Sequence, residues 1–126
     1  MPPTSKQRQI KEIIKCGKDP VHFFNRYSQI QHPTRGLIPF KTYDFQNDCT
    51  ASFNDHRFNI ILKSRQLGLS TLAAAYAVWL AVFYKDKSIL VIATKLAVAM
   101  NFIKKVKTVM NNMPKWLLLP DVVENN

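Results

Sequence analysis

The stretch from Lys63 to Thr71 holds the residues best suited to chemistry in this chain. It reads Lys-Ser-Arg-Gln-Leu-Gly-Leu-Ser-Thr and lies between a short apolar run and a longer one. Loops that bind nucleotide phosphates combine a glycine, which lets the backbone approach the phosphates, with a lysine and a hydroxyl that binds Mg²⁺. Gly68 and Ser70 fit this pattern. The sequence therefore predicts a phosphate-binding loop, with Ser70 as the Mg²⁺ ligand and Thr71 supporting it.

The loop departs from the usual pattern at two positions. Lys63 stands where the first glycine is expected, and Leu69 stands where the lysine is expected. A cation near the phosphates need not come from one backbone position. We therefore expect Lys63 to reach the β- and γ-phosphates and Arg65 to add a planar fork suited to phosphate. The predicted nucleotide-binding residues of this loop are Lys63, Ser64, Arg65, Gln66, Leu67, Gly68, Leu69, Ser70 and Thr71. Basic residues beside a strand end are also commonly plain surface charges. The elements that flank the loop must therefore decide whether it binds phosphate.

The elements around the loop predict a βαβ unit. Residues 58–62 and 88–94 are short apolar runs typical of buried strands, and residues 70–83 form a helix that is apolar all round and should be buried. Residues 96–110 form an amphipathic helix. This order predicts an α/β fold: the parallel sheet of a P-loop NTPase of RecA or helicase-like type, incomplete and flanked by helices.

Helices are also predicted before the loop. Residues 1–18 form a basic helical candidate, and Asp19-Pro20 has the sequence of an N-cap followed by a proline at the first helical position. Prolines and Gly36 predict a loop over residues 33–39, and residues 43–53 predict a further helix.

Composition favours a folded domain with a polyanionic partner. The chain has 126 residues, 47% hydrophobic and 21% charged, and 18 Lys and Arg against 8 Asp and Glu leave a net charge of +10. Such a balance suits nucleic acid, nucleotide phosphates or an anionic surface, although a solvated basic surface would also produce it. The two cysteines, Cys16 and Cys49, have no metal-ligand spacing with any histidine, which predicts free thiols and histidines that are structural or surface residues.

The apolar run before Tyr84 also raises the question of a membrane. Only residues 72–84 are uniformly apolar, which is shorter than the roughly 20 residues of a membrane span. We therefore expect a buried helix and no membrane partner.

Taken together, these residues resemble the large terminase subunit of T4-like tailed phages, the ATPase motor that packages DNA into the capsid. The resemblance covers about residues 15–116 and is carried by the stretches 18–23, 31–40, 43–46, 63–71 and 89–95. The lysine at the start of the loop is similar to the deviant Walker A loop of lambda-type terminases.

The resemblance implies cofactors, roles and partners. ATP and Mg²⁺ would be the cofactors, Gln46 would contact the adenine, and Arg65 would be the catalytic arginine that stabilises charge on the γ-phosphate. The partners would be double-stranded DNA, the small terminase subunit, the capsid portal and further copies of the chain. The protein would work in the host cytoplasm, transiently on the procapsid, and be absent from the mature virion.

The acidic pair of a Walker B strand is missing from the sequence, as is a nuclease carboxylate cluster. The resemblance implies a full-length ATPase with an endonuclease domain, so we expect this chain to be a fragment that does not hydrolyse ATP alone. Residues 1–36 would be an N-terminal helical segment, and residues 37–126 the first part of the ATPase domain.

Two other functions stay open. One is a fragment of a related helicase-like DNA translocase. The other is a non-enzymatic nucleic-acid-binding module in which Lys104, Lys105 and Lys107 form a DNA-binding face.

Overall fold

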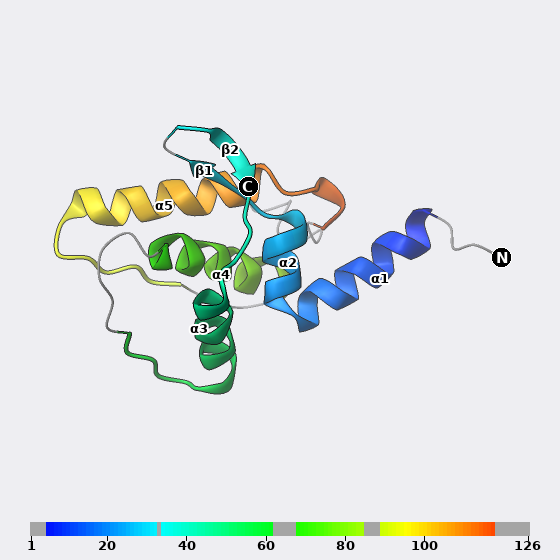
Figure 1. Ribbon diagram of the computed structural model, residues 1–126, viewed down its shortest axis with the longest axis horizontal. Helices are drawn as coiled ribbons and strands as arrows, with labels where there is room; N and C mark the ends of the chain where they lie inside the picture. Colours follow the sequence, from blue (N-terminus) through cyan, green and yellow to red (C-terminus); the bar gives the residue numbers. More distant parts are fainter. Residues whose placement is uncertain (1–4, 33, 62–67, 85–88, 118–126) are drawn as a thin grey trace.

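The computed structural model describes residues 5–32, 34–61, 68–84 and 89–117. Helices dominate this part of the chain (Figure 1). In chain order the elements are α1 (Ser5–Lys18), α2 (Pro20–Tyr27), β1 (Gln29–His32), β2 (Gly36–Pro39), α3 (Asp44–Asp55), α4 (Leu69–Phe83), α5 (Leu96–Asn111) and a 3₁₀ turn, η1 (Lys115–Leu117). The helices predicted after Asp19-Pro20 and at 43–53, 70–83 and 96–110 are therefore confirmed. The one predicted at 1–18 is confirmed from Ser5 onward, because residues 1–4 lie outside the described residues.

Helix α4 forms the centre of the core, as its uniformly apolar sequence predicts. Leu72, Val78 and Val82 are almost wholly shielded from solvent, and burial of such a side chain contributes about 1.5–3 kcal/mol. Figure 1 shows α4 with α5 along one side of it and α2 and α3 near its other faces. None of the described helices has the length and apolar character to cross a membrane, and α4 itself has 15 residues.

The corner between α1 and α2 is set by a cap and a proline. The Asp19 carboxylate accepts hydrogen bonds from the backbone N–H of Val21 at 3.1 Å and of His22 at 3.3 Å, as its N-cap position predicts. Pro20 begins α2 and has no N–H, so the Cys16 carbonyl lacks the donor that a continuing helix would supply four residues later. The indole N–H of Trp79 takes that place, at 2.7 Å from the Cys16 oxygen.

The predicted parallel sheet of a P-loop NTPase is wrong for the described part of the chain. The strands found there are β1 and β2, which pair as an antiparallel hairpin with Ile30 opposite Ile38 and His32 opposite Gly36. The loop predicted at 33–39 thus contains a strand. Gly36 has φ of +75°, a conformation that glycine adopts readily at a turn. The predicted boundary between residues 36 and 37 falls within β2.

The two predicted strands flanking α4 are not strands where they are described. Residues 58–61 and 89–94 make no ladder, and Ile60 is 94% exposed and Leu90 83% exposed. An apolar run indicates that a segment favours burial, but a strand also needs a hydrogen-bonded neighbour. Within the described residues neither run has one. The remaining position of the first predicted strand, Leu62, lies outside the described residues, as does Ser88 of the second.

We expect Trp79→Phe to lower the free energy of unfolding by about 2–4 kcal/mol, because it removes buried volume and leaves the Cys16 carbonyl without its donor. Urea unfolding followed by circular dichroism measures this. Trp116→Phe is the matched control: Trp116 is only partly buried and packs edge-on against Tyr27, so the loss should be about 1 kcal/mol. Equal losses would contradict a special role for Trp79.

Candidate functional site

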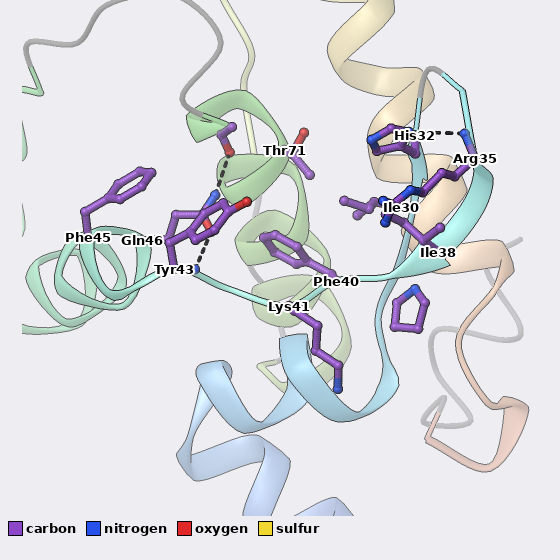
Figure 2. A pocket seen from close by; sticks show the side chains of 12 residues that line it. Ile30, His32, Arg35, Ile38, Phe40, Lys41, Tyr43, Phe45, Gln46 and Thr71 are labelled. Carbon is purple, nitrogen blue, oxygen red and sulfur yellow. Dashed lines mark hydrogen bonds between the residues drawn. The ribbon is translucent and has the colours of Figure 1, made fainter.

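A cavity of about 650 Å³ lies between the hairpin, α3 and the first turn of α4. Figure 2 shows the α3 side chains on one side of it and the hairpin side chains on the other, with the start of α4 between them. Small-molecule sites commonly have volumes of roughly 300–1,000 Å³. The lining residues are Ile30, His32, Arg35, Ile38, Pro39, Phe40, Lys41, Tyr43, Phe45, Gln46, Gly68 and Thr71.

The structure brings Gln46 against Gly68, although the two lie 22 positions apart in the sequence. The side-chain amide of Gln46 donates to the Gly68 carbonyl at 3.3 Å, and its oxygen accepts from the backbone N–H of Tyr43 at 2.9 Å. Figure 2 shows both bonds. Gln46 is only 2% exposed. The residue predicted to contact adenine therefore adjoins the glycine of the predicted phosphate loop.

Gly68 has two separate reasons to be glycine. Its φ is +71°, which disfavours any residue with a Cβ atom. A Cβ atom placed there would also lie 2.9 Å from the amide nitrogen of Gln46. Gly68 is the N-cap residue of α4, and no side chain caps the helix there. The first N–H groups of a helix without a side-chain cap favour an anion or another acceptor.

The residues after Gly68 divide between core and surface. Leu69 is buried in the hydrophobic core, so this position supplies an apolar contact and no cation. Ser70 is exposed and Thr71 is half-buried, and of these two hydroxyl residues only Thr71 lines the cavity. The structure leaves the magnesium role of Ser70 a prediction. The predicted site residues Lys63, Ser64, Arg65, Gln66 and Leu67 lie outside the described residues.

An aromatic pair stands on the α3 side of the cavity. The rings of Tyr43 and Phe45 stack with centroids 5.8 Å apart and planes only 10° from parallel. Tyr43 is 68% exposed, so one flat aromatic surface is open to a planar ligand. Sequence reasoning missed this pair, since two aromatic residues two positions apart indicate stacking only once the helix start at Asp44 is known.

Basic side chains line the hairpin side of the cavity. The His32 Nδ1 atom accepts from the backbone N–H of Thr34 and of Arg35, each at 3.1 Å, so His32 organises the turn that carries Arg35. Lys41 instead donates to the Asn25 carbonyl at 3.1 Å and points toward α2 in Figure 2. Of the described lysine and arginine side chains that line this cavity, Arg35 is therefore the one that makes no hydrogen bond like that of Lys41. The sequence itself marks Arg35 only as a basic residue next to Gly36.

A second cavity of about 420 Å³ adjoins the first and shares Ile30 and Thr71 with it. Lys104 and Lys105 of α5 line this second cavity, whereas Lys107 does not. None of the described residues that line either cavity is acidic. The two cavities together therefore form a basic region around the first turn of α4, which suits an anionic ligand.

No protein-family model matches the chain. The chemistry of the site therefore has to be inferred from its residues. A planar aromatic surface, a buried primary amide, an open helix start and several lysine and arginine side chains suit a ligand with one flat ring and one anionic end.

We expect Gly68→Ala to lower the free energy of unfolding by about 1 kcal/mol more than Gly36→Ala. Both substitutions strain a positive φ, but open space surrounds Gly36 while Gln46 crowds Gly68, and displacing Gln46 loses its hydrogen bonds. Denaturant unfolding of both variants measures the difference. In a Gln46→Ala background the excess should nearly vanish, and an undiminished excess would show that Gln46 is not its cause.

Proposed function

We propose that this chain binds ATP in the cavity between the hairpin, α3 and α4, as a segment of a viral terminase large subunit. Such a motor couples ATP hydrolysis to the packaging of double-stranded DNA, with a small subunit, a portal and further copies as partners. The single observation that supports the proposal most is the contact of Gln46 with Gly68, because it joins the predicted adenine contact to the predicted phosphate loop. The proposal does not depend on a parallel sheet.

The adenine end of the ligand would lie against α3. A base stacked on Tyr43 would extend the stacked pair that Tyr43 makes with Phe45. The Gln46 amide uses one N–H and one oxygen lone pair internally, so a second N–H and a second lone pair remain. One donor and one acceptor in a plane match the N7 and N6 positions of adenine, which favours ATP over GTP.

The phosphate end would lie at the first turn of α4. The backbone N–H groups there, with the Thr71 hydroxyl and the lysines of the neighbouring cavity, provide donors and positive charge for phosphate oxygens. Mg²⁺ prefers oxygen ligands and commonly bridges substrate phosphates. No described lining residue is acidic, and Ser70 is exposed beside Thr71 without lining the cavity itself. Ser70 would therefore hold Mg²⁺ at the edge of the cavity, together with the phosphates themselves.

A second candidate function is a basic module that binds nucleic acid without nucleotide. Lys104, Lys105 and Lys107 are all exposed on α5, and the whole chain has a net charge of +10. Such a module would contact the phosphate backbone, and its affinity would fall steeply with salt.

We expect Tyr43→Ala to weaken ATP binding about fivefold or more, because stacking on a base contributes about 1–3 kcal/mol. Titration calorimetry with MgATP and MgGTP measures this and should show tighter binding of ATP. Phe58→Ala is the control, since Phe58 is 82% exposed and does not line the cavity. No measurable ATP binding, or equal effects of both substitutions, would refute the proposal.

The lysines of α5 separate the two candidate functions. If ATP phosphates lie near Thr71, Lys104→Gln and Lys105→Gln should each weaken MgATP binding several-fold, while Lys107→Gln should not. If the helix is instead a nucleic-acid face, each of the three should weaken duplex DNA binding alike and reduce its salt slope by about 0.9. Calorimetry measures the affinity of each variant for MgATP. A series of salt concentrations measures its affinity for duplex DNA and the dependence of that affinity on salt.

A further inference from the structure

Three metal-ligating side chains meet at the corner between α1 and α2. Glu12 and Cys16 lie one turn apart on α1, which places them on the same face, and His22 faces them from α2. The His22 Nε2 atom lies 2.8 Å from a Glu12 carboxylate oxygen, and the three donor atoms all lie within 4.8 Å of one another. The sequence spacing predicted no metal site here, because the Pro20 corner is what brings His22 back toward α1.

The corner is held by the core. Cys16 is fully buried, and its carbonyl is bonded to the Trp79 indole. Gly17 packs beside Phe83, where a Cβ atom would lie in ordinary van der Waals contact with the ring at 3.5 Å. The N-cap bonds of Asp19 fix the first turn of α2, where His22 lies. Cys16 and His22 are therefore positioned by packing and capping that do not involve a metal, and Glu12 is held by its hydrogen bond to His22.

We propose that Glu12, Cys16 and His22 bind a zinc ion. A thiolate, an imidazole and a carboxylate are the ligand types that Zn²⁺ takes in proteins, and three protein ligands leave a fourth position for water. Tetrahedral zinc would place the three donors about 3.3–3.6 Å apart. The His22–Glu12 pair, at 2.8 Å, would have to open by roughly 0.5 Å to reach that spacing. A donor pair as wide as the 4.8 Å limit would have to close by roughly 1.2 Å. Glu12 and His22 keep 31% and 17% of their side chains exposed, which provides a path from solvent.

Zinc binding would require the Cys16 thiol to lose its proton, because the thiolate is the form that binds the metal. The hydrogen bond with His22 lowers the pKa of Glu12, so its carboxyl group is ionised at neutral pH. Burial raises the pKa of the Cys16 thiol to about 12, so without a metal the thiol is protonated. Zinc deprotonates a coordinating thiol outright, and the thiol proton passes to solvent as the bond to sulfur forms.

The main alternative is an ion pair between Glu12 and His22 that needs no metal. That alternative gives the Cys16 sulfur no part, whereas zinc binding requires it. The corner also lies near Trp79, about 16 Å along α4 from Gly68 at 1.5 Å per residue. The zinc proposal is therefore independent of the proposed ATP site, and either can fail alone.

The test uses the whole chain with a reductant that contains no thiol. Competition with a chromophoric chelator should show one Zn²⁺ bound per chain, and Co²⁺ should produce a thiolate-to-cobalt charge-transfer band. Glu12→Gln and His22→Gln should each weaken Zn²⁺ binding about tenfold or more, and Cys16→Ser should abolish the cobalt band. Cys49→Ser and His56→Gln are the matched controls and should leave both readings unchanged.

Absence of stoichiometric binding, or equal binding by the ligand variants and the controls, would overturn the proposal. A cobalt spectrum without the charge-transfer band would do the same, since it would exclude sulfur. Circular dichroism checks that each variant is folded. If Cys16→Ser does not fold, the wild-type cobalt band together with the losses in Glu12→Gln and His22→Gln decides the question.

Discussion

The hydrogen bond from Trp79 to the Cys16 carbonyl is the contact on which the arrangement of the helices depends. Pro20 lets the chain turn sharply out of α1, but it leaves a buried carbonyl without the donor that a helix normally provides. The indole N–H of Trp79, on the central helix α4, donates to that carbonyl instead. The bond joins the end of α1 to α4, and the same turn directs Phe23 and Phe24 of α2 into the core.

Helix α4 then has a different environment at each of its ends. Its first turn meets Gln46 through Gly68, and it borders two cavities. Basic and aromatic side chains line the first cavity, and two lysines of α5 line the second. Its last turns meet the α1–α2 corner through Trp79 and Phe83. Because an apolar helix can be buried on every face, α4 holds both regions without contributing charge to either. The candidate nucleotide and zinc sites share this support and no residue.

The helices could be predicted from the sequence because their signals are local. The Asp19-Pro20 cap and the apolar run of α4 depend on neighbours a few positions away. The strands could not be predicted in this way, because pairing depends on a partner that an apolar run does not reveal. The prolines and Gly36 predict a loop, although β2, which begins at Gly36, pairs with β1. Of the residues at the cavity, Gly68 is predicted from the loop pattern and Gln46 from the family resemblance, and their roles stay predictions. Their bond, the Arg35 position and the meeting of Cys16 with His22 arise from tertiary contacts that no spacing encodes.

The exposed runs at 58–61 and 89–94 have a consequence for the behaviour of the chain at high concentration. Residues 89–94, Ile-Leu-Val-Ile-Ala-Thr, form a β-prone window without charge or proline, the type of segment that joins strands of different molecules. What opposes such association between copies is their mutual repulsion at a net charge of +10. At 0.1 M salt, charges more than about 10 Å apart are largely screened from one another. The apolar attraction between copies is not weakened in this way. The colloidal stability of this chain therefore depends on ionic strength far more than its folded core does.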